Sequence, residues 1–141
     1  MRVLALDHGA ARCGCAVSDP TGTIATPLDP IERPDTRKGL ARITALVAEL
    51  QAERVIVGLP LRLRGGDSEQ TRNARAFAER LASKLSIPVD LYDERFTTRL
   101  AQRTGGRGSE DSRAAAHLLE GWLMRHHAGE PGTPDGRDLT G

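Results

Sequence analysis

The chain has few aromatic residues, few cysteines and no long apolar run. One Trp, one Tyr and two Phe occur among 141 residues, so stacking of rings on unpaired bases would be limited. No segment approaches the run of about 20 apolar residues that spans a bilayer, and the opening MRVLALD does not resemble a secretory leader. Cys13 and Cys15 are the two cysteines, and their close spacing does not suit a disulfide framework. These absences predict a cytoplasmic protein.

A strong excess of basic charge is also missing. The formal net charge is +1, so the overall composition does not by itself indicate nucleic-acid binding. Between Arg54 and Arg113, however, twelve basic residues stand against eight acidic ones, and eleven of the twelve are arginine. The planar guanidinium group suits phosphate oxygens, which favours phosphate contacts in this region. The alternative is a compositional bias, because the whole chain has eighteen Arg and two Lys.

The pattern of apolar residues predicts alternating strands and helices. Five apolar segments have the length and composition of β-strands, namely residues 2–6, 13–18, 23–28, 54–59 and 89–92. Turns at Gly9 and Gly22 join the first three as an antiparallel meander, with Pro27 restricting the third to an edge or to its end.

Helical spacing of apolar residues appears in three longer segments, 40–50, 77–85 and 115–123. Asp35 or Thr36 would cap the first helix, and a short further helix is expected from Thr97. Residues 104–109 are expected to be a flexible stretch before the last helix.

The order of these elements predicts an α/β fold. Right-handed crossovers place the fourth and fifth strands parallel to the first, with helices covering the sheet. The expected architecture is a mixed five-stranded sheet of order 3-2-1-4-5 flanked by helices, which is the arrangement of ribonuclease-H-like proteins. One domain over residues 1–128 accounts for all of these elements. Residues 129–141, rich in Gly, Pro and Asp, are expected to form a flexible tail.

Acidic residues follow two of the predicted parallel strands. Asp7 ends the first strand, and Asp93 and Glu94 end the fifth, so both strands bring carboxylates to the same edge of the sheet. Asp111 lies in the first turn of the last helix. Structural interpretations compete with this one: Asp7 could bond the backbone at Gly9, and Asp111 could interact with the helix dipole. Because the fourth strand separates the first and fifth by about 9.5 Å between axes, Glu94 must lean inward to join the others.

A cation would explain why several carboxylates share one cleft. Converging carboxylates repel one another and lose hydration, so they usually imply a bound cation or an altered protonation state. Oxygen ligands favour Mg²⁺ or Mn²⁺ over zinc, and such an ion can activate water and neutralise charge on a phosphodiester. Asp7, Glu94 and Asp111 are therefore the candidate catalytic residues and metal ligands.

Four motifs occur in the order found in the YqgF/RuvX family. The chain resembles this family at residues 7–19 (DHGAARCGCAVSD), 57–61 (VGLPL), 93–98 (DERFTT) and 110–116 (EDSRAAA), within a similarity that extends from Met1 to about Arg125. The resemblance implies a ribonuclease-H-like fold related to Holliday junction resolvases. It also implies a nuclease that matures the 5′ end of the 16S ribosomal RNA precursor or resolves branched DNA, with an acidic site carried by Asp7, Glu94 and Asp111.

Four arginines are candidates for contacts with nucleic-acid phosphates. Arg12 and Arg95 stand beside the candidate acids, whereas Arg62 and Arg64 lie in a glycine-containing loop that could approach a phosphate backbone. Solvated surface arginines are the competing interpretation. The chain also departs from the family pattern here, since Ala11 stands where a basic residue is usual and the loop after Pro60 differs. These departures concern substrate contacts more than the metal site.

Two further side-chain groups are weaker candidates. Cys13, Cys15, His126 and His127 do not have the spacing of a zinc site, and a buried strand explains the two cysteines better. His8 could assist proton transfer, but a turn residue of this kind is expected to be exposed.

Two other functions stay open on the sequence. A non-catalytic RNA- or DNA-binding adaptor could keep the fold without turnover. An ATP-phosphate-binding module of the actin and sugar-kinase type also begins with a strand followed by Asp-x-Gly, as in Asp7-His8-Gly9. That class needs a second lobe with a second phosphate loop, and no other Asp-x-Gly follows a strand in this chain. Whether the chain acts alone or as a homodimer is likewise open.

Overall fold

Five strands and three helices form the part of the chain that the computed structural model describes, residues 1–60, 66–94 and 110–127. Their order is β1 (Val3–Asp7), β2 (Arg12–Ser18), β3 (Ala25–Glu32), α1 (Arg37–Leu50), β4 (Arg54–Leu59), α2 (Glu69–Ala82), β5 (Val89–Asp93) and α3 (Glu110–His127). The predicted short helix from Thr97, the stretch 104–109 and the tail 129–141 lie outside the described residues.

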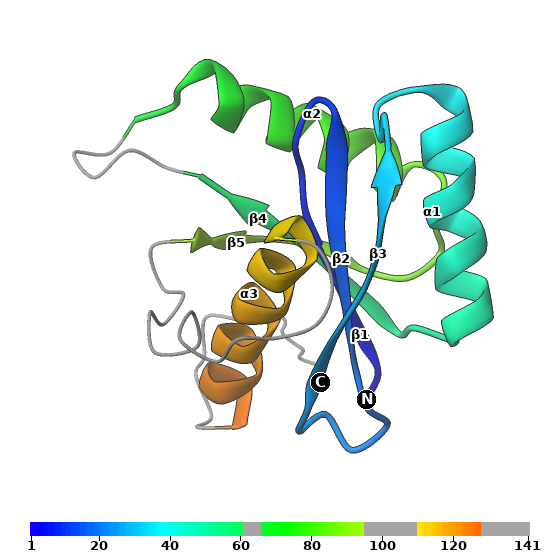
Figure 1. Cartoon of the computed structure of the whole chain (residues 1–141), viewed down its shortest axis with the longest axis vertical. Helices are drawn as coiled ribbons and strands as arrows, with labels where there is room; N and C mark the ends of the chain where they lie inside the picture. Colours follow the sequence, from blue (N-terminus) through cyan, green and yellow to red (C-terminus); the bar gives the residue numbers. More distant parts are fainter. Residues whose placement is uncertain (61–65, 95–109, 128–141) are drawn as a thin grey trace.

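The strands form one mixed sheet in the order β3-β2-β1-β4-β5 (Figure 1). β2 pairs antiparallel with both β1 and β3, while β4 pairs parallel with both β1 and β5. This is the sheet order predicted from the sequence. The parallel arrangement brings the carboxyl ends of β1, β4 and β5 to the same edge of the sheet.

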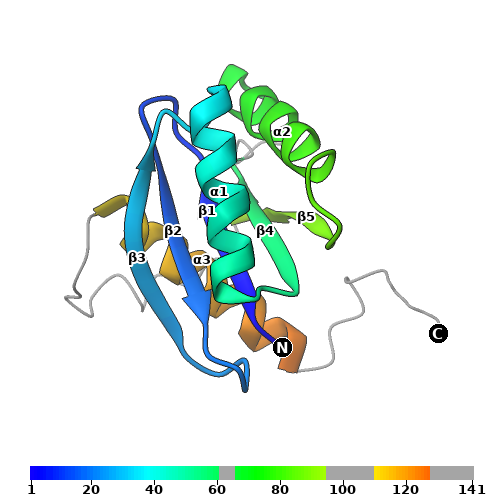
Figure 2. The same ribbon diagram turned by 90° about the vertical axis from the view of Figure 1, so that its right-hand side faces the viewer.

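Helices cover both faces of the sheet, with α1 and α2 on one face and α3 on the other (Figure 2). Alternation along β1 places Leu4 and Leu6 in the core beneath α1 and α2, and Val3 and Ala5 in the core beneath α3. Asp7 lies two residues after Ala5 and so shares the face of Val3 and Ala5. Its side chain therefore belongs to the α3 face of the sheet.

The ends of β3 and α2 differ from the prediction, and the start of α1 shows which of the two predicted capping residues is used. β3 continues to Glu32 and so contains two prolines, which an edge strand tolerates because only one of its sides must supply hydrogen bonds. α2 ends at Ala82, and Leu85 packs on the core from beyond the helix. Thr36 caps α1, because its hydroxyl accepts a hydrogen bond from the Gly39 backbone nitrogen at 3.0 Å.

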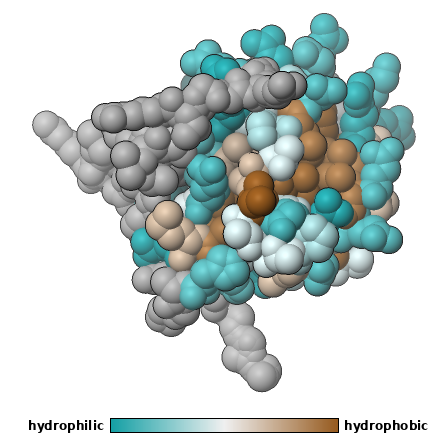
Figure 3. Space-filling model, turned by 60° about the horizontal axis from the view of Figure 1, so that its bottom comes forward, coloured by the Kyte–Doolittle hydropathy of each residue, from teal (hydrophilic) through white to brown (hydrophobic). Residues whose placement is uncertain are grey.

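The surface carries only scattered large apolar side chains in the described part of the chain. Met1, Ile24, Leu91 and Met124 are exposed, and they come from different elements or turns. On the lower face of the molecule, apolar and hydrophilic side chains lie side by side (Figure 3). Folded proteins commonly expose single apolar residues, so these do not mark a site. None of the described helices has the length and apolar character needed to cross a membrane.

Candidate active site

Asp7 and Asp111 are brought together by the packing of α3 on β2. Asp7 is paired with Gly14 across the β1–β2 ladder. A Cβ atom at Gly14 would lie 1.9 Å from the carbonyl oxygen of Asp111, so only glycine leaves room for the helix backbone. The hydroxyl of Ser112 also accepts a hydrogen bond from the Cys15 backbone nitrogen at 3.2 Å. The first turn of α3 is thereby docked on the strand beside Asp7.

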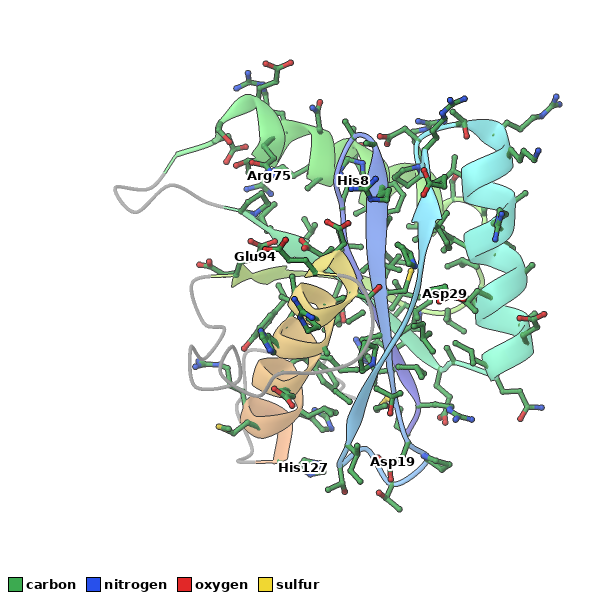
Figure 4. The ribbon with its side chains drawn as sticks, viewed as in Figure 1. His8, Asp19, Asp29, Arg75, Glu94 and His127 are labelled. Carbon is green, nitrogen blue, oxygen red and sulfur yellow. The ribbon has the colours of Figure 1, made fainter. Side chains whose placement is uncertain are left out.

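Glu94 reaches Asp7 by crossing β4 at a second glycine. Glu94 directly follows β5, and β4 lies between β5 and β1. A Cβ atom at Gly58 would lie 2.6 Å from Oε2 and 3.2 Å from Cγ of Glu94, so the Glu94 side chain occupies the space above the glycine. Its carboxyl group hydrogen-bonds Asp7. The inward lean required by the strand spacing is present, and Figure 4 shows Glu94 at the end of β5 near the start of α3.

Burial and neighbouring acids raise the proton affinity of Asp7. Burial raises the pKa of Asp7 to about 7, and the charge of Glu94, the hydrogen bond with Glu94 and the charge of Asp111 add to the rise, whereas His8 opposes it. Burial is also the largest cause of the raised pKa of Glu94, although its hydrogen bond with Asp7 acts in the opposite direction. Near neutral pH, a shared proton or a cation would relieve this repulsion.

The raised pKa of Asp7 predicts that the metal-free protein becomes less stable as the pH rises. The folded chain keeps the Asp7 proton up to about pH 7, whereas the unfolded chain loses it near the ordinary value of 3.8. Since the folded state binds more protons in this window, the free energy of unfolding falls as pH rises through it and levels off above it. We expect a fall on the order of 1 to 3 kcal/mol, measured by urea denaturation in EDTA at several pH values.

Asp7→Asn provides the control for this pH dependence, because it removes the titrating carboxyl group and leaves the other acids in place. The variant should show a shallower fall in the free energy of unfolding across the same window. Equal slopes for the variant and the wild type would contradict the raised pKa.

Arg12 is the partner of Asp111 in this structure. Its Nε donates a hydrogen bond to Oδ2 of Asp111 at 3.1 Å, and both side chains are partly exposed. Arg12 begins β2 on the same face of the sheet as Gly14, two residues along. The hydrogen bond and charge of Asp111, followed by the charge of Glu32, raise the pKa of Arg12.

No three His, Cys, Asp or Glu side chains within residues 1–60, 66–94 and 110–127 already lie in an arrangement that could hold a metal ion. The candidate acids are instead engaged in pairs, Asp7 with Glu94 and Asp111 with Arg12. The other three candidate arginines, Arg62, Arg64 and Arg95, lie outside the described residues.

The prediction that His8 is exposed is wrong. Its side chain is 3% exposed, its Nε2 lies 2.8 Å from Oδ2 of Asp35, and its ring stacks on Phe77 with the centroids 4.5 Å apart. Alternation after Asp7 turns His8 toward the face covered by α1 and α2. Both partners are distant in sequence, so no local pattern signalled this contact.

Cys13 and Cys15 are free and buried, and both belong to the core beneath α1 and α2, as expected for a buried strand. His127 lies at the other end of the molecule from Glu94, where its Nε2 is 2.6 Å from the carbonyl oxygen of Gly22 (Figure 4).

The sequence had no signal for the roles of Gly14 and Gly58, because each depends on an element that packs across the strand.

Curated relatives resemble the chain over most of its length. A relative from Mycobacterium tuberculosis (strain H37Rv), named "Putative pre-16S rRNA nuclease", is 44% identical over 147 aligned residues, covering 97% of this chain and 86% of the relative. A relative of the same name from Anaeromyxobacter sp. (strain Fw109-5) is 41% identical, covering 91% of this chain and 100% of the relative.

Solved structures agree on the fold. RuvC of Thermus thermophilus, solved in complex with a Holliday junction substrate, aligns with a TM-score of 0.67 at 16% identity, covering 92% of this chain and 96% of that chain. A further RuvC structure from the same organism aligns with a TM-score of 0.65 at 15% identity. The fold is therefore ribonuclease-H-like, as predicted. A family model described as "RuvX: Holliday junction resolvase" matches residues 1–125, and the chain belongs to this family.

Proposed function

We propose that the chain is a nuclease that uses a divalent cation to hydrolyse phosphodiester bonds in structured nucleic acid. The observation that carries the proposal is the pair formed by Asp7 and Glu94, whose half-buried carboxyl groups share a hydrogen bond. Burial, together with the charge and hydrogen bond of Glu94, raises the pKa of Asp7 to about 7. Asp111 adds its charge to the same group. Membership of a nuclease family supports the same reaction.

The donor set of the site fits Mg²⁺ or Mn²⁺. Asp7, Glu94 and Asp111 offer carboxylate oxygens, which hard cations prefer. When bound, the ion would supply an activated water and neutralise charge on the scissile phosphodiester. The protein's own contribution is to hold the three acids at one edge of the sheet, through the docking of α3 at Gly14 and the passage of Glu94 over Gly58.

The proposed substrates follow from the names of the relatives and from the residues around the acids. We propose the 5′ region of the 16S ribosomal RNA precursor, branched DNA such as a Holliday junction, or both. Arg12 is accessible at the site and would hold a phosphate near the scissile bond, with Arg62, Arg64 and Arg95 as further candidates. Few aromatic residues are available for base stacking, so recognition would rest on shape and phosphate contacts.

The proposed nuclease domain spans residues 1–128, and the proposed location is the cytoplasm, where the two free cysteines would remain reduced. A homodimer is compatible with this proposal but is not required for it, because one chain supplies all three acids.

The test of the proposal is cleavage of two end-labelled substrates, a 16S precursor fragment and a four-way DNA junction. We expect cleavage of at least one of them with Mg²⁺ or Mn²⁺ and none in EDTA, since the acids need the cation to act on a phosphodiester. Cleavage that continues unchanged in EDTA would contradict the metal dependence. Binding of both substrates without cleavage under either metal would favour the non-catalytic adaptor.

A further inference from the structure

Arg12 lies between acidic residues of two different elements. Its Nε bonds Oδ2 of Asp111 in α3 at 3.1 Å, and its Cα is paired with that of Glu32 across the β2–β3 ladder. The side chains of Arg12 and Asp111 are 53% and 39% exposed. Exposed ion pairs contribute little to stability, so the Arg12–Asp111 bond can open at small cost.

The Arg12–Asp111 bond competes with the proposed metal site. The Nε bond orients Oδ2 of Asp111 toward Arg12, and the guanidinium charge beside this carboxylate repels a cation. The described residues hold no ready arrangement of three acids for a cation. A phosphate group is an alternative anion for Arg12, and the planar guanidinium can donate paired hydrogen bonds to two phosphate oxygens. Transfer of Arg12 from Asp111 to a phosphate would therefore release the carboxylate.

We propose that Arg12 is a positioning residue that occupies Asp111 until a substrate phosphate binds it, and that this exchange couples nucleic-acid binding to cation binding. The inference rests on the proposed function, because it takes Asp111 as a metal ligand. Coupling of this kind is reciprocal. Loss of Arg12 should strengthen cation binding at Asp111, and loss of the Asp111 carboxylate should strengthen phosphate binding by Arg12. Each half of the exchange can be measured without turnover.

The first measurement is the affinity for Mn²⁺ alone, by calorimetry, for the wild type and Arg12→Gln. The variant should bind Mn²⁺ about two- to fivefold more tightly, because a weak surface ion pair no longer competes for Asp111. The same variant should cleave less efficiently at low substrate concentration, because the phosphate partner is gone. Arg75→Gln is the matched control, since Arg75 is a half-exposed arginine whose Nε bonds Asp67 at 2.9 Å. Its Mn²⁺ affinity should equal that of the wild type.

The second measurement is binding of the four-way DNA junction in EDTA, by fluorescence anisotropy. Asp111→Asn removes the carboxylate that binds Arg12, whereas Asp7→Asn, compared at a pH above the Asp7 pKa of about 7, removes one charge from the same site and leaves the Arg12 pair intact. Asp111→Asn should therefore bind the junction about two- to fivefold more tightly than Asp7→Asn does. When Arg12→Gln is added to both variants, the two double variants should bind the junction equally tightly.

Three outcomes would count against the proposal. Arg12→Gln that binds Mn²⁺ no more tightly than the wild type would overturn it, because Arg12 would then support the metal site or be irrelevant to it. Equal junction binding by Asp111→Asn and Asp7→Asn would overturn it as well. A wild-type chain that binds no Mn²⁺ would instead refute the proposed metal site, and the inference with it.

Discussion

Asp7→Asn is expected to abolish metal-dependent cleavage while the chain remains folded. The substitution removes a charged oxygen from the proposed metal site and keeps the volume of the side chain. Replacing groups that merely orient a metal ligand typically costs about 10- to 100-fold in activity, so loss of a ligand itself should cost at least about 100-fold. The measurement is single-turnover cleavage of the preferred substrate with Mg²⁺ and with Mn²⁺.

Stability separates this catalytic interpretation from a structural one. Asp7 is an acid whose pKa is raised by burial and by the charges of Glu94 and Asp111, so its ionised form costs free energy in the folded, metal-free chain. Asp7→Asn should therefore be as stable as the wild type at pH 8 in EDTA, or more stable. A structural turn aspartate would give the opposite result.

Asp29→Asn is the charge-matched control, because Asp29 is exposed on the edge strand β3, in a part of the sheet remote from Glu94 in Figure 4. It should cleave at the wild-type rate. Full activity of Asp7→Asn under both metals would refute the role of Asp7, and a large loss in Asp29→Asn would show that overall charge rather than the acidic site controls the rate.

The sheet order and the convergence of the acids were predictable because both depend on local patterns. Strand-length apolar segments and helical spacing determine the order of the elements, and right-handed crossovers then restrict the topology. Asp7 ends β1, Glu94 directly follows β5, and the two strands run in the same direction, which is enough to place both acids at one edge of the sheet. Asp111 required the additional assumption that the last helix begins at that edge.

The contacts that complete the site were not predictable from local patterns. His8 is buried by Asp35 and Phe77, and Arg12 bonds Asp111, which lies 99 residues away. Local sequence patterns do not indicate contacts between residues so far apart in the chain. Gly14 could equally have been a flexible position in a strand, and its role became visible only once α3 was seen to pack across it.

Gly14→Ala is expected to destabilise the chain by about 2 to 4 kcal/mol, since a methyl group there forces apart two packed backbones. The new Cβ would lie 1.9 Å from the Asp111 carbonyl oxygen and 2.9 Å from the Ser112 backbone nitrogen, and neither atom can move without the helix. The shift would also carry Asp111 away from Asp7. Urea denaturation and single-turnover cleavage should therefore both show large losses.

Gly58→Ala is the matched comparison, because it places the same methyl group on β4, where the nearest atoms belong to the side chains of Glu94 and Leu118 rather than to the backbone. Its Cβ would lie 2.6 Å from Oε2 of Glu94, which can rotate away at a cost of about 1 kcal/mol or less in stability. Cleavage should still fall, because Glu94 can no longer cross β4 to Asp7. If Gly14→Ala were no less stable than Gly58→Ala, α3 would not be held against β2 by the close backbone contact. Ser112→Ala removes the hydroxyl that accepts the hydrogen bond from the Cys15 backbone nitrogen, and it should lower stability by about 1 kcal/mol. This variant keeps the test informative if Gly14→Ala fails to fold.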